Sequence, residues 1–180
     1  MYREELIKLL EAYVLRNTED GDAALETLKF INSNSEIFGK ANSKGHVTAS
    51  AWIVNEEMDS ALLTHHGKLN IWVQMGGHTE IGERILEAAL REAEEESGLS
   101  DLKVLSTDIF DVDVHLIPES KKAPAHYHYD IRFLLLGNRE KPLVISDESH
   151  EIKWVALEEI TNYSTEISID RMVRKTRCLK

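Results

Sequence analysis

Three glutamates gather in one segment of the chain, at Glu92, Glu95 and Glu96. Residues three and four apart share one side of a helix, so these carboxylates would lie together and repel one another. Acidic residues near the C-terminal end of a helix also oppose its dipole. A divalent cation would relieve both penalties, and carboxylate oxygens are ligands that Mg²⁺ prefers. The alternative is a solvated acidic helix face, which is common in proteins.

The neighbouring residues favour the metal site over the solvated face. Gly76-Gly77 precede the helix predicted over residues 83–97, and glycine allows the backbone to approach a ligand closely. Arg91 stands next to Glu92 and can hold carboxylates through paired hydrogen bonds. Glu83, two helical turns before Arg91, could complete a shell that orients the metal ligands.

The segment from Gly77 to Leu99 resembles the Nudix box, the signature of the Nudix hydrolase family. That signature is a glycine, five residues, a glutamate, seven residues, Arg-Glu, an aliphatic residue, any residue, Glu-Glu, any residue, a glycine and an aliphatic residue. Every fixed position is matched, although Ala93 is small for its aliphatic place. The resemblance implies an α/β fold, an α/β/α sandwich with a mixed β-sheet over about residues 40–165.

The resemblance also implies an activity, because Nudix proteins typically hydrolyse a nucleoside diphosphate linked to another moiety by attack of a metal-activated water. Glu92 and Glu96 look like direct ligands of Mg²⁺ or Mn²⁺, and Glu95 like a further ligand, direct or through water. The carbonyl of Gly76 resembles the backbone ligand of the family. Glu83 with Arg91 resembles its orienting pair.

The general base stays open between Glu92, Glu95 and a glutamate from a later loop. Glu148, before the predicted strand that carries Trp154, is such a glutamate, with an exposed loop acid as the alternative. A catalytically silent Nudix-fold nucleotide-binding module is the alternative function. Such modules commonly lose box glutamates, and here all are present.

Polar residues alternate along a predicted strand over residues 128–136. His128, Asp130 and Arg132 share one face, so we predict that they bind the substrate, with Arg132 clamping an anionic group. The alternatives are a solvent-exposed sheet face and a simple ion pair between Arg132 and Asp130. The chain has eight histidines, but no pair has a helical ligand spacing, so a dedicated zinc site is not predicted.

Composition limits the partners of this chain. Its 180 residues carry a formal net charge of −11, which disfavours nucleic acid and anionic membranes as partners and suits a divalent cation. The single Cys178 excludes a disulfide framework and a cysteine-based zinc site. With no membrane-length apolar stretch and no secretory signal at the start, we expect a cytoplasmic protein that acts on a small molecule.

The remaining segments must position the acidic helix. Apolar residues at helical spacing predict a helical N-terminal extension over residues 1–38, serving as a packing cover or a homodimer surface, followed by the Nudix hydrolase domain at 39–180. Strands mixed with helices, without regular βαβ alternation, indicate a mixed-sheet sandwich. Further strands are predicted at 47–54, 60–64, 71–73, 102–117 and 152–155, a short helix at 157–160 and a final helix at 168–175.

Overall fold

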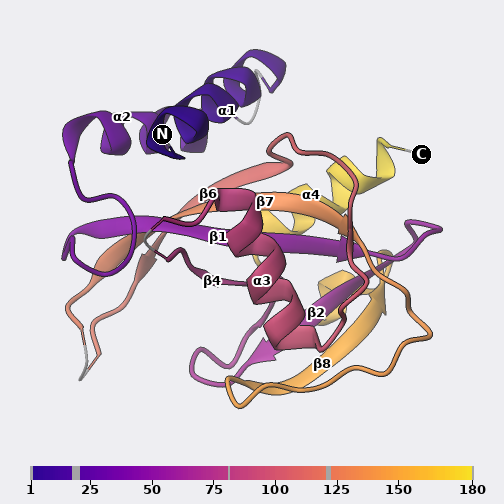
Figure 1. Cartoon of the computed structure of the whole chain (residues 1–180). Coiled ribbons are helices and arrows are strands. Elements are labelled where there is room, and N and C mark those ends of the chain that lie inside the picture. Colours follow the sequence, from indigo (N-terminus) through magenta and orange to yellow (C-terminus); the bar gives the residue numbers. More distant parts are fainter. Residues whose placement is uncertain (1, 18–20, 81, 121–122, 180) are drawn as a thin grey trace.

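A single mixed β-sheet organises the chain, with helices packed on both of its faces (Figure 1). The computed structural model describes residues 2–17, 21–80, 82–120 and 123–179. Ile81, within the segment from Gly77 to Leu99, therefore lies outside the described residues. In chain order the elements are α1 Tyr2–Arg16, α2 Asp22–Ser33, β1 Gly45–Val54, β2 Ser60–His66, β3 Trp72–Val73, β4 Met75–His78, α3 Ile85–Ser97, β5 Lys103–Val104, β6 Asp111–Ile117, β7 His126–Leu136, β8 Ser149–Ala156, the 3₁₀ turn η1 Ile160–Asn162 and α4 Ile167–Arg177.

Strand β1 lies at the centre of this sheet. It pairs in parallel with β7 from Gly45 to Val54, and antiparallel with β2 at its C-terminal end. The short strand β4 pairs antiparallel with the middle of β1, so that Gly76 lies opposite Ser50 and His78 opposite Thr48. This pairing attaches the start of the segment from Gly77 to Leu99 to the central strand.

The two faces of β1 differ in chemistry, although all ten of its residues are buried. Val47 and Ala49 join the apolar cluster beneath α1, α2 and α3. On the opposite face the strand carries His46, Thr48 and Ser50 before reaching Trp52, which packs against α4. A fully buried strand with one polar face requires partners for its polar groups inside the protein.

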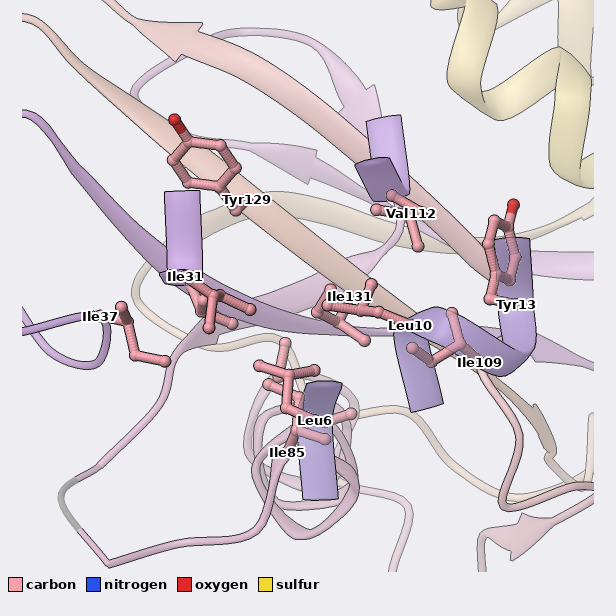
Figure 2. Packing of buried hydrophobic residues seen from close by; sticks show 14 of the residues in the cluster. Leu6, Leu10, Tyr13, Ile31, Ile37, Ile85, Ile109, Val112, Tyr129 and Ile131 are labelled. Atoms are coloured by element: carbon pink, nitrogen blue, oxygen red, sulfur yellow. The ribbon is translucent and has the colours of Figure 1, made fainter. Parts of the chain in front are cut away.

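The N-terminal helices share the core of the sheet. Leu6, Leu10 and Tyr13 of α1 are buried in the same cluster as Ile31 of α2 and Ile131 of β7 (Figure 2). These contacts agree with the predicted packing cover. The boundary at residues 38 and 39, and a homodimer surface on these helices, stay predictions.

The sequence prediction was wrong about one strand and missed another. The strand predicted over 102–117 is two strands, β5 and β6, because Ser106-Thr107-Asp108 lie exposed between them and Ile109 turns into the core. Strand β4 was missed because a Gly-Gly pair is untypical of strands. The short helix predicted at 157–160 is the 3₁₀ turn at Ile160–Asn162, and no described helix is long and apolar enough to cross a membrane.

The buried face of α1 generates a stability prediction. Leu10 is fully buried, so Leu10→Ala leaves a cavity and is expected to lower the free energy of unfolding by about 2–5 kcal/mol. Leu15 on the same helix is 82% exposed, and Leu15→Ala is expected to change it by at most about 0.5 kcal/mol. Urea unfolding measures both, and equal effects would show that α1 does not pack as described.

Candidate active site

The carboxylates of Glu92 and Glu96 lie against the two glycines of β4. One oxygen of Glu96 accepts a hydrogen bond of 3.2 Å from the backbone N–H of Gly76. A Cβ atom on Gly77 would lie 2.5 Å from a carboxylate oxygen of Glu92, and one on Gly76 would lie 2.7 Å from the carbonyl oxygen of Ala49. Gly77 therefore leaves room for the carboxylate of Glu92, and Gly76 lets β4 lie close against β1 while its N–H binds Glu96.

Burial makes the charged form of these acids costly. Glu96 is 8% exposed, and its burial raises the pKa to about 7, assisted by the charges of Glu92 and Glu148 and opposed by the Gly76 N–H. Burial also raises the pKa of Glu92, against the hydrogen bond from Arg91. A cation between the two carboxylates would remove this cost.

Arg91 holds the acidic helix to the loop before it. Its Nε donates to Glu83 Oε1 at 2.8 Å and its Nη2 to Glu83 Oε2 at 3.0 Å, a paired contact. Nη2 also donates to the carbonyl oxygen of His78 at 3.1 Å, and Nη1 to Glu92 Oε1 at 2.9 Å. The hydrogen bond with Arg91 lowers the pKa of Glu83. The structure therefore brings the predicted orienting pair together and links it to Glu92.

Glu95 and Glu148 lie at the margin of the pair formed by Glu92 and Glu96. The Glu95 side chain is 61% exposed and one oxygen lies 3.3 Å from Arg91 Nη1. Glu148 precedes β8, and its carbonyl accepts a hydrogen bond of 2.8 Å from Gly67 N–H. Its carboxylate is near enough for its charge to raise the pKa of both Glu92 and Glu96. The fold thus brings Glu148 to the acidic helix across fifty residues of sequence.

The donor set fits a hard divalent cation. Two neighbouring carboxylates and a third acid within electrostatic reach offer oxygen atoms, the ligands that Mg²⁺ and Mn²⁺ prefer. Glu96 has a protein partner on one oxygen, the Gly76 N–H, which leaves carboxylate lone pairs for an ion. The ligand roles of Gly76, Glu92, Glu95 and Glu96 stay predictions that this arrangement supports.

Arg132 lies in the interior and not at the rim of a cleft. Its side chain is 3% exposed, and Nε donates to Asp130 Oδ2 at 2.7 Å. Nη1 and Nη2 reach Asp111 Oδ2 at 3.2 Å and Asp113 Oδ2 at 3.4 Å. Arg171 of α4 also donates to Asp111, which covers this network from the helix side. These contacts fit the ion-pair alternative, in a buried form, and oppose the predicted substrate clamp.

Asp130 is likewise committed to internal partners. Besides Arg132, it accepts hydrogen bonds from the hydroxyls of Thr48 at 3.0 Å and Ser50 at 2.8 Å. Burial alone would raise the pKa of Asp130, but the charge of Arg132, the charge of His115 and the hydrogen bonds from Arg132 and Ser50 together outweigh it, so the pKa is lowered. Sequence reasoning missed Asp111 and Arg171 as parts of this network, because the contact between β6 and α4 leaves no local signal. His128 lies further along the same face, among other histidines.

Fold and site together define a Nudix-type hydrolase domain. A family model described as the NUDIX domain matches residues 44–175, and the chain belongs to the Nudix hydrolase family. It is 30% identical over 135 residues, 73% of this chain and 78% of the relative, to a "Probable DHNTP pyrophosphohydrolase" of Lactococcus lactis subsp. cremoris.

Solved structures give the same fold. A Nudix family hydrolase from Clostridium perfringens superposes with a TM-score of 0.58 at 25% identity, over 77% of this chain and 99% of the other. An Ap4A hydrolase from C. elegans superposes with a TM-score of 0.60 at 21% identity, over 74% of this chain and 96% of the other. The likeness to the C. elegans protein shows the shared fold alone.

The raised pKa of Glu96 predicts a pH-dependent effect on stability without metal. The folded state binds the proton of Glu96 more tightly than the unfolded state, so this residue stabilises the fold least above pH 7 and most below its ordinary pKa of about 4.5. Glu96→Gln removes the charge but keeps an oxygen that can accept from Gly76. In metal-free buffer at pH 8 we expect it to raise the free energy of unfolding by about 1–3 kcal/mol.

This gain should shrink as the pH falls from 8 towards 5, where wild-type Glu96 becomes protonated. Glu94→Gln, on another side of the helix, is the control and should show no such pH-dependent gain. Denaturant unfolding at several pH values measures the difference. A gain that does not depend on pH would contradict the assigned burial of charge.

The Arg132 network generates a further prediction. Arg132→Met leaves the buried Asp130 without its main cation, so the free energy of unfolding should fall by about 3–5 kcal/mol. Arg174→Met removes an ion pair whose arginine side chain is 60% exposed, and should cost at most about 1 kcal/mol. If Arg132→Met had the stability of wild type but a lower catalytic efficiency, the result would support the interpretation of Arg132 as a substrate clamp.

Proposed function

We propose that this protein is a metal-dependent hydrolase that cleaves the diphosphate bond of a nucleoside diphosphate linked to another moiety. The observation that carries the proposal is the convergence of Glu92 and Glu96 on Gly76 and Gly77, with Arg91 fixed by Glu83 behind them. This arrangement supports an oxygen-lined cation site between strand β4 and helix α3. Membership of the Nudix hydrolase family supports the same reaction class.

Each residue of the site receives a role in this proposal. Glu92, Glu96 and the carbonyl of Gly76 would hold Mg²⁺ or Mn²⁺, with Glu95 as a further ligand, direct or through water. When bound, the cation would screen the phosphate charges and lower the pKa of a coordinated water. Arg91 keeps Glu92 in place and balances the charge of Glu83.

The general base is the least constrained role. Glu148 lies on an exposed loop yet acts electrostatically on Glu92 and Glu96, so it can face both the site and water. Glu92 is partly committed to Arg91, which makes it a weaker candidate for accepting a proton. We favour Glu148 as the base and keep Glu95 as the second candidate.

The substrate is proposed to be a small anionic metabolite. The net charge of −11 makes nucleic acid and anionic membranes poor partners, and it fits a cytoplasmic enzyme whose substrate arrives together with a cation. The relative in Lactococcus lactis is described as acting on DHNTP. A substrate panel should therefore contain dihydroneopterin triphosphate beside nucleoside diphosphate derivatives and dinucleoside polyphosphates.

Activity measurements with matched variants test this proposal. Purified protein should release phosphate-containing products from at least one panel member with Mg²⁺ or Mn²⁺, and EDTA should stop the release. Glu96→Gln should lower kcat/KM by at least about a hundredfold while the fold survives, because the cation loses a charged ligand. Glu94→Gln should remain within about twofold of wild type.

Two outcomes would contradict the proposal. Equal losses in Glu96→Gln and Glu94→Gln would show that the wrong side of the helix has been assigned. Binding of a panel nucleotide without any metal-dependent turnover would favour the catalytically silent binding module.

A further inference from the structure

Histidines from separate strands meet on the polar face of the sheet. His46 of β1, His78 of β4 and His128 of β7 each bring a ring nitrogen within 4.8 Å of those of the other two. The parallel register places His46 beside His128, and β4 brings His78 next to Thr48, two residues along β1. Three adjacent strands therefore present imidazoles to one point.

His46 has no adequate partner for its ring. The residue is 3% exposed, and neither Nδ1 nor Nε2 has a well-formed hydrogen bond with a described residue. A contact with the backbone of Asn42 raises the pKa of His46, but burial lowers that pKa by more. A buried polar group without a partner is uncommon, and an unseen ion or water is one of its standard explanations.

His126 is arranged as a metal-binding histidine would be. Its Nδ1 lies 2.8 Å from the carbonyl oxygen of Pro124, which can only accept, so Nδ1 carries the proton and Nε2 of the neutral ring has a free lone pair. Metal-bound histidines commonly donate their other N–H to a carbonyl in this way. Nε2 of His126 lies 3.3 Å from Nε2 of His128, and two ligand nitrogens of a tetrahedral zinc ion lie about 3.3 Å apart.

We propose that His46, His78 and His128 bind one transition-metal ion of the Zn²⁺ class, with His126 as the fourth ligand. The three nitrogens lie within 4.8 Å of one another, and binding would close them to the spacing of about 3.3 Å between ligands of a tetrahedral ion. Imidazole nitrogen suits zinc, copper, nickel and iron, whereas Mg²⁺ prefers oxygen, so this site is chemically distinct from the carboxylates of α3.

The electrostatic setting agrees with neutral ligands. Burial lowers the pKa of His46 to about 4 and that of His128 to about 3, so both rings are uncharged at neutral pH and can bind a cation without losing a proton. The charge of Asp130 acts on His128 from the same face. The sequence prediction missed this site because its ligands come from three strands and share no helical spacing.

Zinc titration of the metal-free full-length protein tests the proposal. The titration is run with excess Mg²⁺, which competes for the carboxylates of α3. Wild-type protein should bind one equivalent of Zn²⁺ and gain melting temperature, and Co²⁺ should give the intense visible absorption of a tetrahedral complex. His46→Leu and His128→Ala should each weaken zinc binding by at least about a hundredfold.

Two matched variants separate this site from other zinc ligands. His150→Ala removes an exposed histidine outside the cluster, and Glu96→Gln removes a carboxylate of the proposed catalytic site; both should bind Zn²⁺ like wild type. Absence of zinc binding in wild type, or an equal loss in Glu96→Gln, would overturn the proposal. If His46→Leu does not fold, two other measurements still decide the proposal. They are zinc binding by His128→Ala, which changes a half-buried residue, and the Co²⁺ spectrum of wild type. Loss of hydrolysis in Glu96→Gln with zinc binding retained would keep the two proposals separate.

Discussion

The burial of two neighbouring carboxylates, nearly complete for Glu96 and partial for Glu92, is the constraint on which the rest of this structure depends. Glu96 and Glu92 lie side by side in the protein, where burial and mutual charge disfavour ionisation. The chain can hold them there because β4 offers glycines at the point of contact and because Arg91 binds Glu92 from behind. The pairing of β4 with the middle of β1 anchors this arrangement in the centre of the sheet. A site that costs stability without a cation is thus attached to the central strand of the sheet.

The opposite face of the sheet buries polar groups in a different way. Arg132 is surrounded by Asp130, Asp111 and Asp113, and Arg171 closes the network from α4. There each charge meets its counterion inside the protein, so no external ion is needed. The histidine cluster lies on the same face but lacks such compensation, since the ring of His46 has no well-formed partner among the described residues. The charges of the Arg132 network are thus balanced by other protein groups, whereas a bound ligand would supply the missing partner of the histidine cluster.

Local patterns explain which parts of this fold were predictable. The spacing of the glutamates, Arg91 and the glycines lies within one strand–loop–helix unit, so the sequence indicates their mutual positions. Alternation along residues 128–136 correctly placed His128, Asp130 and Arg132 on one face, but it could not show that face to be covered. The cover comes from β6 and α4, and strand register and helix docking depend on contacts distant in sequence. For the same reason the proximity of His46, His78 and His128 could not be predicted without knowledge of the strand pairing.

His78 belongs to both of the arrangements described above. Its backbone carbonyl accepts a hydrogen bond of 3.1 Å from Arg91, which in turn holds Glu92 and Glu83. Its ring points into the cluster with His46 and His128. Strand β4 spans only Met75–His78, so any force that fixes the His78 ring also restrains Gly76 and Gly77, against which the carboxylates pack. A metal ion held by the histidines would therefore stiffen the short strand against which the proposed catalytic acids pack. In this fold a nitrogen-lined site would act as structural support for an oxygen-lined one, although the two select different metals.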